Sequence, residues 1–253
     1  MDDNDLKTID NNKPSSWNFI DVLLIVFGIG VIFALGFFIF GVIVSSNGNG
    51  IPQGIQPNAF TSLWLTALET IALVGSVYLI GLVRKGYHWK EMGYKPTSIK
   101  WLLGSAGISL LGIPVSGVIA LIILQVFNIP MNNPQLDFLL PKDFTWLSGL
   151  GLVILGGIFV PFAEELFFRG ILYNWFKEHW GVWPSAILSA LLFGVAHGDL
   201  LVGTIAFILG IVLALVYEYS HSLWNAFMIH AVNNSARIIL LYLLLALGLL
   251  TGQ

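Results

Sequence analysis

Residues 19–44 read FIDVLLIVFGIGVIFALGFFIFGVIV, and this stretch decides the fold class of the chain. A helix of about 20 residues crosses the roughly 30 Å hydrocarbon core of a bilayer, so the run is long enough to span a membrane. It is longer than the apolar part of a secretory signal peptide, about 7 to 15 residues, and the polar residues before it are acidic on balance. We therefore predict a cytoplasmic tail at residues 1–18, followed by an uncleaved first membrane span.

The composition of the whole chain agrees with a membrane protein. Of its 253 residues, 57% are hydrophobic and 10% are charged, and the mean hydropathy is +0.84. Soluble domains carry about 25% charged residues. The net charge is -3 and no basic cluster alternates with aromatic residues, which argues against a nucleic-acid partner. Because cysteine is absent, disulfides, thiolate metal sites and a cysteine nucleophile are excluded.

Further apolar runs of spanning length follow along the chain. The sequence predicts an all-α, polytopic bundle of about seven membrane segments, within a range of six to eight, near residues 19–44, 60–83, 101–127, 146–176, 183–197, 200–219 and 222–250. The polar triplet at 233–235 interrupts the last run, so it fits either one tilted span or two short ones. The lipid bilayer is thus the first expected partner, whereas nothing in the sequence predicts an oligomeric state.

The charges of two loops predict the orientation of the bundle. The connection at 45–59 has no charged residue, whereas the connection at 84–100 carries five lysines and arginines. Short loops rich in Lys and Arg stay in the cytoplasm. We therefore expect an integral, multi-pass protein of the cell membrane with its N-terminus in the cytoplasm.

A few ionisable residues lie at membrane depth, where each charge costs at least roughly 2.5–3.5 kcal/mol. Such residues usually face a bundle interior or a watery cavity, so several together indicate a site buried between helices. They are Glu69, Glu164, Glu165, Arg169, His197, Glu218, His230 and Arg237.

The first cluster is FAEELFFRGI, residues 162–171. Glu165 and Arg169 are four residues apart, so they share a helix face and can form an ion pair. Glu164 points about 100° away and is left as the unpaired carboxylate. Pro161 removes a helical hydrogen bond to Gly157, which predicts a kink beside the acid pair. The alternative is a buried polar clamp between helices, without chemistry.

Two later segments carry imidazoles. Phe193 and His197 lie one turn apart on one stripe, and His230 and Asn234 share a face in the last segment. At about 1.5 Å per residue, Glu164 and His197 reach a similar depth, roughly 20 Å from the cytoplasmic side, so we expect them to face each other. Taken singly, each imidazole also fits ordinary packing and hydrogen bonding between helices.

A carboxylate, two imidazoles and an amide suit the activation of water. Glu164 could take a proton from water that His197 holds, while His230 and Asn234 donate hydrogen bonds to the oxyanion formed from an amide carbonyl. Glu164, His197 and His230 also form a possible His₂Glu zinc set. There is no H-E-x-x-H motif, and the residues leave open whether the site needs no cofactor or uses Zn²⁺.

Three spacings together resemble the motifs of the CPBP family, the type II CAAX prenyl endopeptidases and bacteriocin-processing (Abi) intramembrane proteases. They are E-E-x-x-x-R, F-x-x-x-H and H-x-x-x-N, and the residues that carry them are Glu164, Glu165, Arg169, Phe193, His197, His230 and Asn234. The resemblance covers residues 146–250, which we expect to form the catalytic core. Residues 19–145 are then transmembrane segments without a matched motif.

The resemblance implies an intramembrane endopeptidase that acts on a membrane-associated, lipidated or hydrophobic peptide or protein. It implies that Glu164 and His197 activate water, that His230 and Asn234 form the oxyanion hole, and that the other three residues support the site. Members of this family are described both as metalloproteases and as glutamate-dependent enzymes, so the resemblance leaves the metal open too.

Two other classes of protein remain alternatives. A non-catalytic membrane scaffold, or a bacteriocin immunity or regulatory protein, could use the same fold. A transporter could use Glu69, Glu218 and the Glu164–His197 pair as a proton path. A transporter does not explain why Asn234 lies beside His230, and the sequence shows no repeat symmetry. Glu69 and Glu218 receive no role in the peptidase prediction.

Overall fold

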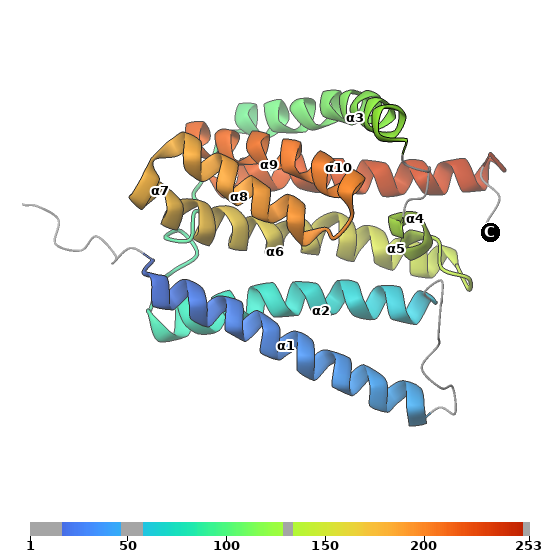
Figure 1. Cartoon of the computed structure of the whole chain (residues 1–253), viewed down its shortest axis with the longest axis horizontal. Coiled ribbons are helices and arrows are strands. Elements are labelled where there is room, and N and C mark those ends of the chain that lie inside the picture. Colours follow the sequence, from blue (N-terminus) through green and yellow to red (C-terminus); the bar gives the residue numbers. More distant parts are fainter. Residues whose placement is uncertain (1–16, 47–57, 129–133, 250–253) are drawn as a thin grey trace, which may run out of the picture.

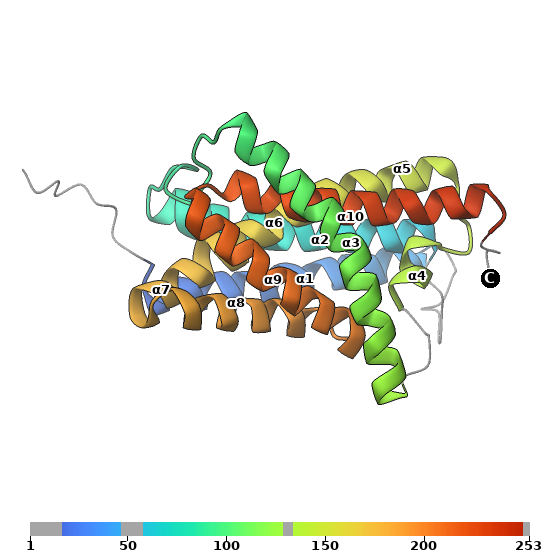
Figure 2. The same cartoon turned by 90° about the horizontal axis from the view of Figure 1, so that it is seen from above.

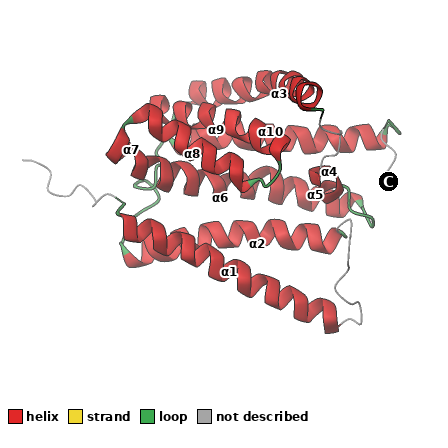
Figure 3. Ribbon diagram, viewed as in Figure 1, coloured by secondary structure: helices red, strands yellow, loops and turns green. Residues whose placement is uncertain are grey.

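The computed structural model of the chain describes residues 17–46, 58–128 and 134–249. Every regular element in these ranges is a helix, which confirms the predicted all-α fold (Figure 3). Six helical rods are long and apolar enough to cross a membrane, and α8 is a shorter apolar helix. Most of the predicted cytoplasmic tail lies outside the described residues.

The rods follow the predicted segments closely. Their bounds are α1 (Phe19–Ser46), α2 (Ala59–Val77) continued by η1 (Tyr78–Arg84), α3 (Ile99–Phe127), the rod from α5 (Trp146–Ile154) to α7 (Asn174–Trp180), α8 (Val182–Ala196), α9 (Leu200–Ser220) and α10 (Leu223–Ala246). A short helix, α4 (Pro134–Leu139), precedes α5. The last rod is one unbroken helix through the polar triplet, so the reading as two short spans is wrong.

The rods run roughly side by side along the long axis of the molecule (Figure 1). The rod that carries α6 (Val160–Phe167) lies in the middle, with α1 and α2 on one side and α8, α9 and α10 on the other (Figure 1). Helix α3 crosses α9 and α10 obliquely on the outside (Figure 2). The middle rod is therefore covered on both sides, and polar side chains on it lie inside the bundle.

The middle rod has two widened turns. Helix α5 starts at a capping box formed by Thr145 and Ser148 and passes into a π-helical segment, η2 (Leu155–Phe159). Helix α6 follows, and a second π-helical segment, η3 (Phe168–Tyr173), leads into α7. Pro161 stands at the start of α6 and has no N–H to donate. The distortion predicted near this proline takes the form of a π-helical turn, a feature that is frequent at functional sites.

Glycines let α8 and α9 approach each other closely. A Cβ atom at Gly194 would lie 2.6 Å from the Gly203 carbonyl oxygen, and one at Gly203 would lie 2.7 Å from that of Gly194. Both contacts are with backbone, which cannot move aside as a side chain can. The small residues 186, 190 and 194 of α8 therefore form a tight pair with α9, as is typical of membrane helices.

Two sets of ion pairs lie at the end of the bundle that carries η1 and α7 (Figure 1). Asp21 pairs with Arg84 at 2.6 Å and with Lys85 at 2.5 Å. Glu218 pairs with Lys177 at 2.6 Å and accepts a hydrogen bond from the Tyr173 hydroxyl at 2.8 Å. Glu218 therefore has structural contacts at the bundle end.

Candidate functional site

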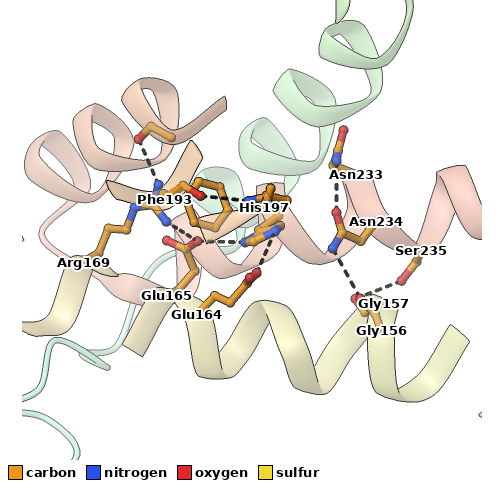
Figure 4. Close-up of polar contacts among 12 residues, drawn as sticks. Gly156, Gly157, Glu164, Glu165, Arg169, Phe193, His197, Asn233, Asn234 and Ser235 are labelled. Carbon is orange, nitrogen blue, oxygen red and sulfur yellow. Dashed lines mark hydrogen bonds and ion pairs between the residues drawn. The ribbon is translucent and has the colours of Figure 1, made fainter. Parts of the chain in front are cut away.

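A buried ion pair forms the base of the site. Arg169 donates from Nη1 to Oε1 of Glu165 at 2.8 Å, and both side chains are 0% exposed. This is the pair expected from their spacing. Nη2 of Arg169 donates to the Gly210 carbonyl on α9 at 3.1 Å, and the guanidinium carbon lies 4.6 Å from the centre of the Phe193 ring. The arginine thus ties α6 to α8 and α9 (Figure 4).

His230 on α10 lies against both carboxylates of the acid pair. Its Nδ1 is 2.8 Å from Oε1 of Glu165, and its Nε2 is 3.4 Å from Oε2 of Glu164. Because Glu165 already accepts from Arg169, we assign it as the carboxylate that accepts the Nδ1–H of His230. Only Nε2 of His230 is then left for chemistry, and it faces Glu164.

Phe193 and His197 form the α8 side of the site. Nδ1 of His197 lies 2.8 Å from the carbonyl oxygen of Phe193. A carbonyl can only accept, so Nδ1 carries the proton and the Nε2 lone pair is free. The Phe193 ring meets His197 edge-on at 4.9 Å and His230 at 5.5 Å between ring centres. Phe193 therefore separates and orients the two imidazoles.

Asn234 is held beside the widened turn of the middle rod. Its Nδ2 donates to the Gly156 carbonyl at 3.3 Å, and Ser235 donates to the Gly157 carbonyl at 3.1 Å. In a regular helix the Gly157 carbonyl would accept from residue 161, which is Pro161 and has no N–H. The proline thus frees a carbonyl that α10 uses, and Asn234 lies toward the glycines rather than in the Glu165–Arg169 group (Figure 4).

The structure differs from the sequence prediction in the partner of Glu164. We expected His197 to face this carboxylate, but in the part of the chain that is described His197 makes no hydrogen bond or ion pair with it. His230 occupies that place. The rise per residue says nothing about how a helix is rotated about its axis, and the imidazole that lies against Glu164 is that of His230.

Glu69 on α2 is the acidic residue that sequence reasoning left without a role. Its carboxyl group lies within hydrogen-bonding reach of the carboxyl group of Glu164. Neither carboxylate can donate unless it holds a proton, so a hydrogen bond between them requires at least one proton. In the sequence, Glu69 stood out only by its position at membrane depth, because no motif joins it to Glu164.

The fit of a zinc ion was tested on the donor atoms. Glu164, His197 and His230 supply suitable atom types, and each imidazole donates Nδ1–H to a second group, as zinc ligands commonly do. However, the described residues contain no group of three His, Asp or Glu side chains close enough to hold a metal. As placed, these side chains do not fit a zinc ion, and no step below passes through one.

Six apolar rods of spanning length define a multi-pass integral membrane protein, and an acid–imidazole cluster lies buried inside its bundle. Residues 145–236 match the family model of the type II CAAX prenyl endopeptidase Rce1-like proteins, which confirms the resemblance predicted from the three motifs. The matched segment contains the two central carboxylates, both imidazoles and Asn234.

One relative is a protein of Bacillus subtilis (strain 168) named "Putative membrane peptidase YdiL". The chain is 24% identical to it over 143 residues, which make up 56% of this chain and 56% of the relative. The match thus spans about half the length of that relative. No solved structure matches the chain.

Proposed function

We propose that this protein is an intramembrane endopeptidase that hydrolyses a peptide bond of a membrane-associated, lipidated or hydrophobic substrate. The observation that carries the proposal is the contact between Glu164 and His230, 3.4 Å apart and buried inside the bundle. A carboxylate at this depth is costly unless it has a function or a partner. Its neighbour Glu165 has Arg169 as an ion-pair partner, whereas Glu164 faces an imidazole nitrogen and a second acid.

Glu164 acts as the general base in the proposed reaction. It takes a proton from water, and the resulting hydroxide adds to the carbonyl carbon of the scissile amide. The Nε2 lone pair of His197 accepts a hydrogen bond from the same water and orients it. When the carbon–nitrogen bond breaks, the proton held by Glu164 passes to the leaving amine, so Glu164 returns to its carboxylate form.

His230 and Asn234 stabilise the oxyanion in this proposal. Glu165 accepts the Nδ1–H of His230 and aims Nε2 into the site, where Nε2 donates to the oxyanion when the ring carries both protons. Asn234 donates one amide N–H to Gly156 and keeps the second for the substrate oxygen. Removing one such donor costs about 10²–10³-fold in kcat in enzymes of this type of chemistry.

We propose that the N-terminus of the chain lies in the cytoplasm. The loop between η1 and α3 and the helix α7 lie at the same end of the bundle (Figure 1). That end carries Arg84, Lys85 and Lys177. Positive residues favour the cytoplasm, which supports a cytoplasmic N-terminus.

The first test is hydrolysis by the purified full chain. We expect cleavage of lipidated or hydrophobic peptides in liposomes, followed by mass spectrometry of the products. Because the proposed step uses only protein groups, the rate should persist after exhaustive chelation, with no zinc found by elemental analysis. Loss of activity on chelation and its return with Zn²⁺ would contradict the metal-free step.

The second test concerns Glu69. Glu69→Leu removes the partner of Glu164, and a hydrogen bond to a charged group contributes about 1.5–3 kcal/mol. We therefore expect kcat to fall roughly 10- to 100-fold. Glu69→Gln can still donate a hydrogen bond to Glu164, so its kcat should fall much less.

Thr70→Val is the matched control on the same helix, because within the described residues the Thr70 hydroxyl bonds only to the Thr66 carbonyl of its own helix. It should cleave at the wild-type rate. An unchanged kcat in Glu69→Leu would remove Glu69 from the site.

A further inference from the structure

The loop between η1 and α3 contains a buried segment, residues 92–97, that the proposed mechanism does not use. Connecting segments usually run over the surface of a protein, where their side chains are exposed. In this loop segment, however, Met92 is 0% exposed and Tyr94 is 6% exposed. The segment lies at the end of the bundle where α10 begins (Figure 2). Its burial indicates that it holds neighbouring helices together.

The side chain of Tyr94 attaches the loop segment to α6. Its hydroxyl donates to the carbonyl oxygen of Phe162 at 3.0 Å, and the two rings stack with their centres 4.8 Å apart and their planes at 20°. A carbonyl oxygen has two lone pairs, so it can accept this bond in addition to one within its own helix. Phe162 stands two residues before Glu164 in the chain. Tyr94 therefore holds the turn of α6 that carries the proposed general base.

The same loop segment is bonded to the start of α10. The carbonyl oxygen of Gly93 accepts from the backbone N–H of Leu223 at 2.8 Å, and that of Lys95 accepts from the hydroxyl of Ser222. His230 follows Leu223 by two helical turns, about 10 Å along the axis of α10. The loop segment therefore joins the start of the helix that carries the proposed oxyanion donor to the turn of α6 that carries the base.

Two further contacts leave the loop segment little freedom to move. Asn225 on α10 donates from Nδ2 to the hydroxyl of Thr97 at 2.9 Å. Gly93 has φ +105°, and a Cβ atom there would lie 2.9 Å from side-chain atoms of Leu223 and 2.9 Å from the Tyr217 hydroxyl. Both the backbone conformation and the lack of space therefore require glycine at this position.

We propose that Tyr94 is a positioning residue, which sets the distance between Glu164 and His230 by joining α6 to α10. The inference rests on the proposed function and deepens it. Tyr94 acts through the two helices that the loop segment joins and takes no part in the chemical step. Oε2 of Glu164 and Nε2 of His230 lie 3.4 Å apart. Because a misplacement of about 1 Å can lower the rate of an enzyme about 10²-fold, this contact needs a rigid support.

Tyr94→Phe tests the hydroxyl and keeps the stacked ring. We expect kcat for peptide hydrolysis by the full chain in liposomes to fall about tenfold, because the base and the imidazole are no longer held at their working distance. The value of KM should stay near that of the wild type, since the substitution acts on the chemical step.

Tyr242→Phe is the matched control. Tyr242 is also 6% exposed, and its hydroxyl also donates to a backbone carbonyl, that of Leu139 at 3.1 Å. It lies near the other end of α10. Both variants lose one hydrogen bond of the same kind, so their midpoints of thermal unfolding should fall by a similar amount. Only Tyr94→Phe should lower kcat.

A pair of glycine variants tests the same junction without removing a hydroxyl. Gly93→Ala presses a methyl group against Leu223, which is 0% exposed and has no free space to move into, so the start of α10 must shift. Gly86→Ala is the control in the same loop. Gly86 also has a positive φ, +71°, but a Cβ atom there meets nothing within 4 Å. We expect kcat to fall at least about tenfold in Gly93→Ala and to stay near the wild-type value in Gly86→Ala.

The position of His230 can also be followed without a substrate. In protein whose histidine nitrogens are isotope-labelled, the NMR resonances of the His230 ring report its contacts with the two carboxyl groups. They are identified by their absence in His230→Gln. These resonances should shift in Tyr94→Phe and in Gly93→Ala, and stay in place in Tyr242→Phe.

The outcomes separate this role of Tyr94 from the proposed function. Unmoved His230 resonances in Tyr94→Phe overturn the role, and so does a kcat that is unchanged in Tyr94→Phe or falls equally in both tyrosine variants. A shift of the resonances together with a fall in kcat that Tyr242→Phe does not show supports it. If the wild type cleaves no peptide, the proposed function fails, whereas the resonances still decide whether Tyr94 sets the position of His230.

Discussion

Glu164→Gln should lower kcat for peptide hydrolysis by about 10²–10⁴-fold, the range that a general base contributes. Glutamine has the shape of glutamate and can keep the contact with His230, but it cannot take a proton from water. The expected change is therefore in kcat, while KM for the peptide stays close to the wild-type value. Single-turnover measurements on purified protein in liposomes separate the two quantities.

Glu218→Gln is the control for this substitution. Glu218 is also a glutamate of a membrane helix, but it pairs with Lys177 at the end of the bundle. Replacing Glu218 should therefore leave the rate of peptide hydrolysis unchanged. Hydrolysis by Glu164→Gln at the wild-type rate would refute the mechanism. A wild type that cleaves nothing, with a cellular role that survives Glu164→Gln, would favour the scaffold or immunity alternative.

The sequence predicted the spans well because span length is a local property. The segment predicted at 200–219 is the helix Leu200–Ser220, and the one at 183–197 is Val182–Ala196. Apolar runs and the thickness of the bilayer decide these ends. The contact between Glu165 and Arg169 was predictable for the same reason, because a spacing of four residues along one helix places both side chains on the same face.

The contacts between helices were not predictable to the same degree. The rise per residue predicted a similar depth for Glu164 and His197, but depth does not determine how a helix is rotated about its axis. The approach of α10 to Gly157, where a Cβ would lie 3.2 Å from the Ser235 Cα, decides that His230 meets Glu164. Glu69 lies on a helix without any motif, so only the packing of α2 against α6 joins it to the site.

The two acids of the opening motif therefore have separate roles, which follow from their partners. Glu165 accepts from Arg169 and from His230, so it orients the imidazole while remaining inaccessible at 0% exposure. Among the residues that the structure describes, no lysine or arginine forms an ion pair with Glu164, which faces Glu69 and His230. In the proposed mechanism Glu165 therefore stabilises the bundle, and Glu164 acts as the general base.

Arg169→Met should lower the free energy of unfolding by about 3–5 kcal/mol, because it leaves Glu165 as a buried charge without its cation. The Gly210 carbonyl on α9 also loses its donor. Chemical or thermal unfolding of the purified protein in detergent measures this loss. The double variant Glu165→Gln, Arg169→Met should recover part of it, since neither charge remains, although His230 then lacks its carboxylate partner.

Lys177→Met is the matched control, since Lys177 also forms an ion pair with a glutamate. Its side chain is 38% exposed and that of Glu218 is 16% exposed, whereas both members of the central pair are 0% exposed. Water screens the outer pair, so its loss should cost only about 0–1 kcal/mol. If Arg169→Met and Lys177→Met lowered the free energy of unfolding equally, burial would not explain the contribution of the central pair to stability. The stabilising role assigned to Arg169 would then be wrong.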